Sequence, residues 1–275
     1  MMFYEDLPIG IHPDCPRQQY IVTHAASPGR LKDILVSPAY MQARRAEPFV
    51  ETSAVRQGKA LATLLEGGEA LLNQEARIFD QDRRTKAGKA AYAEMQEWVN
   101  EESNRYILTP AEYECAYAMA VAISEEAADL LAPAQNECAV VWREEETGIT
   151  CKMLADYWDE ETSTIIEIKS TGQIDRRRNI AADFRYHVQA AMGVDGFNAA
   201  GHLFIWVEQK APYQVIIEPS SEEFLAQGMD AYLQALTIYD KCLRTDQWPK
   251  RKARVNTELD LPAYYRPSYP DLEWS

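Results

Sequence analysis

The sequence predicts an α/β protein, in which a helical first half is followed by a mixed β-sheet flanked by helices. Apolar residues recur at helical spacing up to about residue 131, whereas short β-branched runs bounded by turn residues follow Pro133. No internal repeat or linker separates these parts. We therefore expect one domain over residues 1–275, with a helical part at about 20–132, an α/β core at about 133–245 and an irregular tail at 246–275.

The composition limits the class of protein. The chain of 275 residues is 47% hydrophobic and 26% charged, as in an ordinary soluble globular protein. It has no apolar run near the roughly 18 residues of a membrane span and no signal-peptide order at its start, so we expect a cytoplasmic protein without a membrane partner. Five scattered cysteines without a close pair argue against a structural zinc site or a disulfide framework. The formal net charge of -15 weighs modestly against nucleic acid, although an acidic exterior can surround a basic groove.

Four helices are expected in the first half. Ser27 is a plausible N-cap with Pro28 at the first helical position, and the Ser-Pro pair at 37–38 ends or restarts that helix. The other three are expected at residues 51–72, with a break at Gly67 and Gly68, at 85–103, and at 110–131.

Strands dominate the second half. Three consecutive strands are expected at residues 137–142, 148–158 and 163–170. Two more are expected at 201–209 and 213–219, with a helix from Asp175 to about Asn198 before them and a long capped helix at 220–245 after them.

Charged residues stand out in the hairpin of the second and third strands. Alternation along the third strand sends Ile166 and Ile168 to one face and Glu167 and Lys169 to the other. Asp156 is expected to end the preceding strand, and the turn at 159–162 folds it back beside them. Two carboxylates and one ammonium are therefore expected to converge.

Such a group suits phosphodiester hydrolysis with a hard cation. Mg²⁺ takes a few carboxylate oxygens and keeps several waters, and it can polarise a phosphoryl oxygen and acidify a bound water. Lys169 would orient that water or stabilise developing negative charge. The alternative is that Glu167 and Lys169 form a solvent-facing pair on an edge strand, and spacing alone leaves both open.

The arrangement Asp156...Glu167-Ile168-Lys169 on a hairpin followed by a helix resembles the active site of the PD-(D/E)xK nuclease superfamily, although the usual proline before the aspartate is absent. Further stretches are similar to the exonuclease VIII (RecE-type) group and together cover most of residues 20–250. They are "ECAVVWREEETGITCKMLADYW", "DFRYHVQAAMGVDGF", "LRTDQWP", "LKDILVSPAYMQARR" and "GKALATLLEG".

This resemblance implies a restriction-endonuclease-like fold and an exonuclease that depends on Mg²⁺, with Mn²⁺ as a substitute. Such an enzyme digests double-stranded DNA from its ends, 5′ to 3′, and leaves 3′ single strands for a RecT-like annealing protein. It works as a homo-oligomer in phage or prophage recombination in a bacterial host. The residues it implies are Asp156 and Glu167 as catalytic metal ligands, the backbone carbonyl of Ile168 and Glu137 as further ligands, and Lys169 and Gln189 as catalytic partners.

Two departures from the group pattern keep alternatives open. Alignment places Ala62 where the group has a metal-associated histidine, and Gly193 where it usually has a tyrosine four residues after Gln189. The chain is then either an active nuclease with weaker metal binding or a catalytically weakened DNA-end-binding or scaffolding protein. A nuclease acting on another nucleic acid is the third reading.

Four arginines follow the hairpin, at Arg176, Arg177, Arg178 and Arg185. If they border the cleft, they supply phosphate contacts for DNA in an otherwise acidic chain. A solvated charged face is the equally open alternative.

Overall fold

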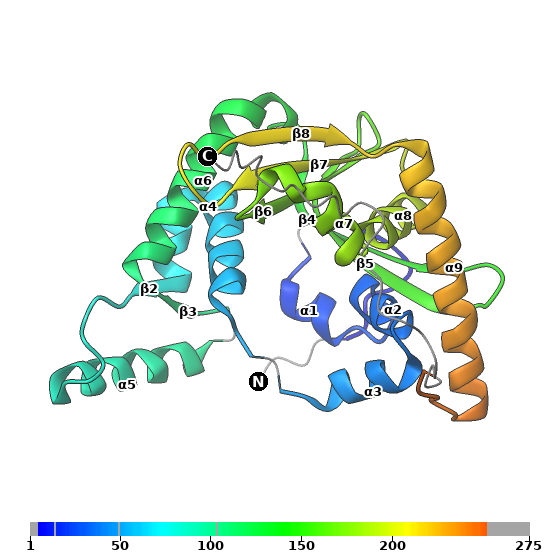
Figure 1. Ribbon diagram of the computed structural model, residues 1–275, viewed down its shortest axis with the longest axis horizontal. Helices are drawn as coiled ribbons and strands as arrows, with labels where there is room; N and C mark the ends of the chain where they lie inside the picture. Colours follow the sequence, from blue (N-terminus) through cyan, green and yellow to red (C-terminus); the bar gives the residue numbers. More distant parts are fainter. Residues whose placement is uncertain (1–4, 14, 49, 103, 252–275) are drawn as a thin grey trace, which may run out of the picture.

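The computed structural model describes residues 5–13, 15–48, 50–102 and 104–251 (Figure 1). Its centre is a six-stranded sheet with strand order β1-β4-β5-β6-β7-β8. Neighbouring strands are antiparallel except for β6 and β7, which are parallel and are joined through helices. The expected mixed sheet is confirmed. The strands are β1 (Gly10–His12), β4 (Gln135–Arg143), β5 (Thr150–Asp159), β6 (Thr164–Thr171), β7 (Gly201–Glu208) and β8 (Val215–Pro219).

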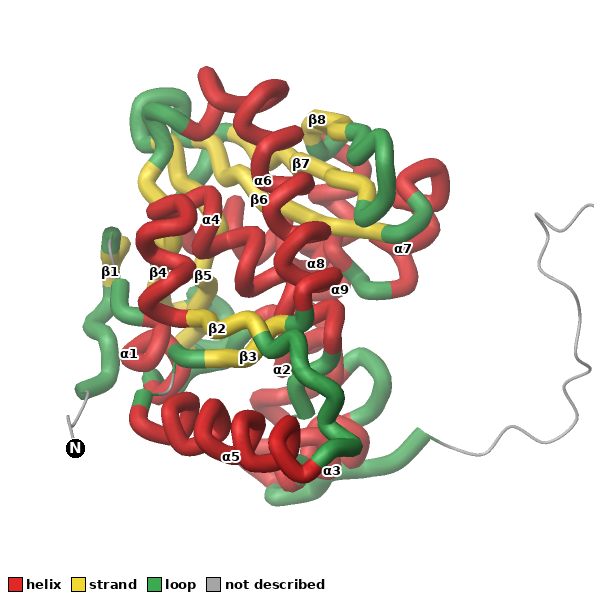
Figure 2. Tube along the Cα trace, turned by 90° about the vertical axis from the view of Figure 1, so that its left-hand side faces the viewer, coloured by secondary structure: helices red, strands yellow, loops and turns green. Residues whose placement is uncertain are grey.

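Helices cover both faces of this sheet (Figures 1 and 2). On one face, α4 and α6 pack over a cluster that includes Ile166 and Ile205. On the other face, α2, α8 and α9 pack over a cluster that includes Met153 and Ile165. The helices of the described residues are α1 (Arg17–Val22), α2 (Pro28–Ile34), α3 (Pro38–Ala46), α4 (Ser53–Glu75), α5 (Lys86–Glu101), α6 (Pro110–Leu131), α7 (Arg177–Asp183), α8 (Tyr186–Phe197) and α9 (Glu222–Thr245).

Helix starts follow local capping chemistry. Thr109 and Glu112 form a reciprocal capping box at the start of α6, with Pro110 at the first helical position. At the start of α2 the side chain of Ser27 accepts a single bond from the backbone N–H of Arg30. Within α4, Gly68 has a φ of 62°, which is the expected break. The irregular tail predicted from residue 246 lies outside the described residues from residue 252 onward.

The single helix expected from Asp175 to Asn198 is wrong. The chain instead forms a 3₁₀ turn at Ile174–Arg176, then α7, and then α8 in a new direction after Arg185, whose φ is 50°. A left-handed backbone costs a non-glycine residue roughly 1–2 kcal/mol, so no local preference explains this break. Packing of α8 against the sheet and α9 determines it, and the side chain of Arg185 donates to the backbone oxygen of Lys32 at 3.4 Å.

Several short elements lie outside the expected pattern. These are β1, α1 and a two-stranded parallel sheet of β2 (Ala76–Ile78) and β3 (Tyr106–Leu108). Figure 1 shows α5 beyond this small sheet, away from the main sheet. The end of α1 is capped by the buried ammonium of Lys152, which donates to the backbone oxygens of Tyr20, Ile21 and Thr23 at 2.5, 3.2 and 2.7 Å.

A search of the described residues for a helix with the length and apolar character of a membrane span finds none.

A buried histidine makes stability depend on pH. His202 of β7 is 3% exposed, its Nδ1 lies 3.0 Å from Ser220 Oγ, and burial, followed by the charge of Lys169, lowers its pKa to about 3. Between pH 6.5 and 3 the unfolded chain binds a proton here that the folded chain does not, so the free energy of unfolding falls as pH decreases. We expect His202 alone to contribute a loss of about 2 kcal/mol between pH 7 and pH 5, measured by urea unfolding as the difference between the parent and a His202→Gln variant, because the raised pKa of Glu167 acts in the opposite direction over the same range.

The control separates this histidine from general acid effects. His202→Gln should lose most of that pH dependence, whereas His24→Gln, at an exposed position, should keep it. Equal slopes in the two variants would contradict the assignment.

Candidate active site

The splayed end of the β5–β6 hairpin brings the predicted charged residues together. The ladder between the two strands ends at the pair Tyr157–Ile166, and the backbone N–H of Ile168 donates to Asp156 Oδ2 at 2.8 Å. Lys169 Nζ lies 3.9 Å from Asp156 Oδ2 and 2.6 Å from Glu167 Oε2. The expectation that Asp156 ends its strand is wrong, because β5 runs on to Asp159.

The turn after β5 is also built from a carboxylate. The side chain of Asp159 accepts from the backbone N–H groups of Glu161 and Thr162 at 3.0 and 3.4 Å and from the Thr162 hydroxyl at 2.6 Å. These bonds hold the tight turn that folds β6 back beside β5.

Glu167 is the most enclosed of the charged residues, with 0% of its side chain exposed. Its Oε2 accepts from Lys169 and also from Gln189 Nε2 of α8 at 2.7 Å. Its Oε1 is buried and has no hydrogen-bond partner among the described residues. A buried carboxylate oxygen without a partner is rare, and a bound ion or water accounts for such an atom.

The pKa values of Glu167 and Lys169 are both raised, although burial acts on them in opposite directions. Burial, and then the nearby Asp156, raise the pKa of Glu167 to about 7. Burial alone would lower the pKa of Lys169, but Glu167 and Asp156 outweigh it and raise that pKa above its ordinary value. Lys169 therefore stays charged at neutral pH and acts as a hydrogen-bond donor and a positive charge, not as a base.

Two further residues at this site were not predicted. The ring of Tyr186, the first residue of α8, lies 5.3 Å from Lys169 Nζ and 5.5 Å from Lys32 Nζ of α2. Burial, and then the charge of Lys169, lower the pKa of Lys32 to about 8. The spacing of Tyr186 and Gln189, three residues apart and so on one helix face, is a signal that could have identified the tyrosine. No sequence signal identifies Lys32, because the pattern of its helix indicates only an amphipathic helix.

A pocket of about 110 Å³ lies on the α4 side of the hairpin and includes Asp156. Ala62 lines it, so the position aligned with the histidine of the resembled group does face this pocket. The volume corresponds to a few water molecules. The residues that line it are Gly58, Leu61, Ala62, Leu65, Asn136, Glu137, Asp156, Tyr157, Ile168 and Ser170.

The donor set fits a hydrated divalent cation. Within the described residues, no group of three or more His, Cys, Asp or Glu side chains is placed to hold a metal ion. Glu137 lines the pocket but is paired with Arg17 at 2.6 Å, so it is not gathered with Asp156 and Glu167. Two carboxylates and the unpartnered Oε1 of Glu167 still suit Mg²⁺ or Mn²⁺, since Mg²⁺ usually keeps several waters and takes only one or two carboxylates.

Gly193, which stands where the resembled group usually has a tyrosine, does not face the hairpin carboxylates. A Cβ at this position would lie 2.9 Å from both Met153 Sδ and Ile165 Cδ1, so Gly193 faces the core between α8 and the sheet. No tyrosine fits there without repacking. The site has its own tyrosine, Tyr186.

The four arginines do not form one surface. Arg177 and Arg178 pair with Glu218 of β8 at 2.9 and 3.4 Å, two strand spacings or about 10 Å from β6. Arg176 donates to the Gln173 side chain at 3.2 Å. Arg185 alone lies next to site residues, between Tyr186 and the backbone oxygen of Lys32.

A solved structure shares this fold. A putative exonuclease from Eubacterium rectale is 13% identical, with a TM-score of 0.56, and the match covers 84% of this chain and 91% of that chain. A phage-related exonuclease from Haemophilus somnus 129PT is 12% identical, with a TM-score of 0.33, over 69% of this chain and 95% of that chain. A comparison with curated proteins finds no match.

The family follows from the sequence itself. A model of the family described as "PDDEXK-like domain of unknown function (DUF3799)" matches residues 27–258, which include the whole hairpin and α8. The resemblance to the PD-(D/E)xK nuclease superfamily and the restriction-endonuclease-like fold are thereby confirmed, and these findings support a nuclease. The chain belongs to the PDDEXK-like family DUF3799.

Proposed function

We propose that the protein is a divalent-metal-dependent exodeoxyribonuclease that digests double-stranded DNA from its ends, 5′ to 3′. The observation that carries the proposal is the unpartnered Oε1 of Glu167 in a buried site shared with Lys169 and next to Asp156. Its biological setting would be phage-type recombination in the cytoplasm of a bacterial host, as a homo-oligomer that passes 3′ single strands to a RecT-like annealing protein.

Each residue has a role that its contacts support. Asp156, Glu167 and the backbone carbonyl of Ile168 would hold Mg²⁺ or Mn²⁺. The bound cation would polarise the phosphoryl oxygen and supply an acidified water. Lys169 would hold the attacking water and stabilise negative charge on the phosphate. Gln189 positions Glu167 by donating to its Oε2, which leaves Oε1 available to the cation.

Positive charge beside the carboxylates supports a phosphate substrate. Lys32, Lys169 and Arg185 lie around Tyr186 in a chain whose formal net charge is -15. A local basic group of this kind attracts a phosphodiester to an otherwise acidic surface.

A cleavage assay tests the proposal. The pure protein is incubated with linear and covalently closed circular duplexes of the same sequence in Mg²⁺ or Mn²⁺. We expect the linear duplex to be degraded and the closed circle to survive, with degradation stopped by a chelator. Labels at the 5′ or 3′ end report the direction. Degradation no greater than that of a Lys169→Ala control would contradict the proposal that the protein is a nuclease.

Among the described residues no third side chain is gathered with Asp156 and Glu167 as a metal ligand, and this, together with Ala62, favours a second candidate. This is a catalytically weakened protein that binds DNA ends and recruits an annealing partner. It predicts retention of linear duplex in a gel-shift assay with no cleavage in Mn²⁺. Single-stranded RNA and branched DNA in the same cleavage assay test a nuclease for another nucleic acid.

A further inference from the structure

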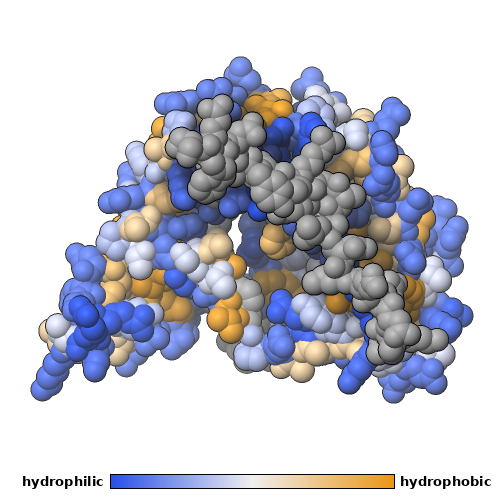
Figure 3. All heavy atoms as spheres, viewed as in Figure 1, coloured by the Kyte–Doolittle hydropathy of each residue, from blue (hydrophilic) through white to orange (hydrophobic). Residues whose placement is uncertain are grey.

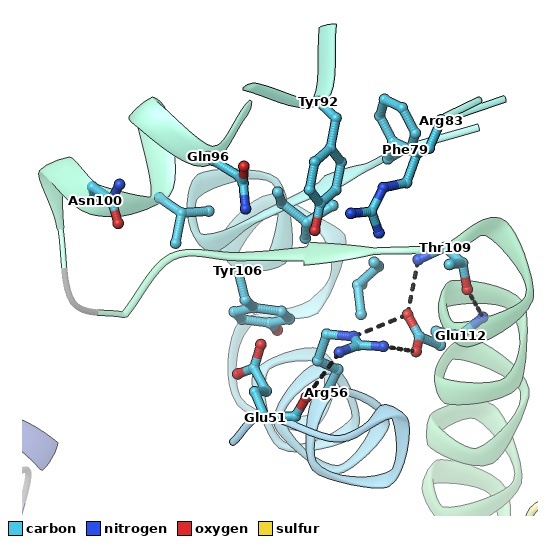
Figure 4. A pocket seen from close by; sticks show the side chains of 13 residues that line it. Glu51, Arg56, Phe79, Arg83, Tyr92, Gln96, Asn100, Tyr106, Thr109 and Glu112 are labelled. Atoms are coloured by element: carbon cyan, nitrogen blue, oxygen red, sulfur yellow. Dashed lines mark hydrogen bonds and ion pairs between the residues drawn. The ribbon is translucent and has the colours of Figure 1, made fainter. Parts of the chain in front are cut away.

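A second and larger cavity, of about 440 Å³, lies apart from the pocket that contains Asp156 (Figure 4). It is enclosed by α5, by β3, and by the starts of α4 and α6. Figure 3 shows the molecular surface notched between the α5 segment, at lower left, and the rest of the molecule. The volume lies in the range of sites that bind small organic groups.

One wall of this cavity is a face of α5. Tyr92, Gln96 and Asn100 follow one another at four-residue spacing and so share that face. The guanidinium of Arg83 lies 3.8 Å from the centre of the Tyr92 ring, and Phe79 meets that ring edge-on at 5.1 Å. Figure 4 shows Tyr92 and Gln96 extending from α5 toward β3, with Arg83 beside Tyr92. Planar groups and primary amides therefore line the same wall.

The polar groups of that wall are unused. Within the part of the chain that the structure describes, the carboxamides of Gln96 and Asn100 and the hydroxyl of Tyr92 have no hydrogen-bond partner. On the opposite side, Arg56 and Glu112 form a bidentate pair at 2.5 and 3.2 Å. One side of the cavity is thus an ion pair whose charges cancel, and the facing side offers hydrogen-bond donors and acceptors to a ligand.

One edge of the cavity, the segment that leads from β2 into α5, is locally basic, whereas the rest of α5 carries Glu94, Glu97 and Glu101. Residues 77–89 contain five basic side chains and two acidic ones, a net charge of +3, in a chain of net charge -15. The basic residues are Arg77, Arg83, Arg84, Lys86 and Lys89, and the acidic ones are Asp80 and Asp82. A basic segment at one edge of a cavity with a neutral lining favours a ligand whose phosphates extend beyond the cavity, such as a nucleic-acid strand.

We propose that this cavity binds an unpaired nucleobase of a DNA strand. Bases stack on aromatic rings and guanidinium planes, and primary amides pair with base edges in both directions. The basic side chains of segment 77–89 other than Arg84, which pairs with Asp82, would hold the phosphates on either side. The inference deepens the proposed function and rests on it in taking DNA as the substrate.

Helix α4 connects this cavity to the pocket that contains Asp156. Arg56 lines the first and Ala62 the second, and six residues of helix separate them by about 9 Å. One strand frayed from a duplex end spans both. The base pocket would then hold the separated strand while the hairpin carboxylates act on the phosphodiester.

Matched variants test this without cleavage. Binding of a fluorescent single-stranded oligonucleotide is measured by anisotropy in the presence of a chelator. Arg83→Ala should weaken binding about tenfold, because stacking contributes roughly 1–3 kcal/mol per base. Arg84→Ala removes the same charge one residue away, from a side chain 92% exposed and outside the cavity, and should weaken binding less than threefold. Tyr92→Phe should bind like the parent and Tyr92→Ala like Arg83→Ala.

An oligonucleotide with abasic sites separates base from backbone. It keeps every phosphate, so it should bind the parent protein about tenfold more weakly, and Arg83→Ala should have little further effect on it. Equal losses for Arg83→Ala and Arg84→Ala, or equal binding of the abasic strand, would overturn the base pocket. Because no metal is present, base-dependent binding in a protein that fails the cleavage assay would reject only the nuclease. Base-independent binding in an active enzyme would reject only the pocket.

Discussion

Glu167→Gln is expected to reduce DNA cleavage by about a thousandfold or more. Glutamine has the same shape but lacks the negative charge that the buried, unpartnered oxygen of Glu167 offers to a cation. The fold should survive, since the raised pKa of about 7 means that this site already tolerates a neutral side chain. The measurement is the initial rate of nucleotide release from linear duplex at saturating Mn²⁺, with circular dichroism as a check on folding.

The control for that variant is Glu218→Gln. It removes one carboxylate from β8, where the carboxylate pairs with Arg177 and not with the hairpin residues. Cleavage should stay within about threefold of the parent, as expected for a residue that acts in neither metal nor phosphate binding. A folded Glu167→Gln protein that keeps a tenth or more of the parent rate would exclude Glu167 as a metal ligand.

Ala62→His is expected to lower the Mn²⁺ concentration for half-maximal cleavage by about tenfold, the effect of roughly 1.4 kcal/mol of added metal binding. Ala62 is exposed and lines the pocket that contains Asp156, so an imidazole there adds a nitrogen ligand next to the carboxylates. The rate at saturating Mn²⁺ should change much less. Metal titration of cleavage, and calorimetry of Mn²⁺ binding without DNA, measure the two quantities separately.

Ala70→His is the matched control on the same helix. Ala70 is also exposed but does not line the pocket, so its replacement should leave the half-maximal concentration unchanged. If both histidine variants show the same Mn²⁺ dependence of cleavage as the parent, a side chain at position 62 does not reach the metal.

Local chemistry explains what could be read from the sequence. The bounds of α6 follow from Thr109, Pro110 and Glu112, which fix the start of the helix through bonds made within four residues. Alternation along β6 correctly placed Glu167 and Lys169 on one face, because a strand has a period of two. Both inferences depend on nearest neighbours in the chain, and so they needed no tertiary information.

What the sequence could not predict depends on contacts between distant segments. Arg185 adopts a left-handed backbone with no glycine or proline nearby, because α8 must turn to pack against the sheet. The strands β2 and β3 have three residues each, and within the described residues each pairs only with the other. Lys32 reaches Tyr186 across 154 positions of the chain, and no local pattern distinguishes it from an ordinary surface lysine.

The pair Arg17–Glu137 connects α1 to the pocket that contains Asp156, where we propose that a cation binds. Arg17 is 59% exposed and Glu137 27% exposed, and pairs of this kind contribute at most about 1 kcal/mol. Arg17 would thus compete with a bound cation for the carboxylate of Glu137, which lines the same pocket as Asp156. Releasing Glu137 to a cation would cost less than a tenfold change in affinity. If the proposed cation binds beside Asp156, Arg17 of α1 therefore determines whether Glu137 can serve as a third carboxylate ligand.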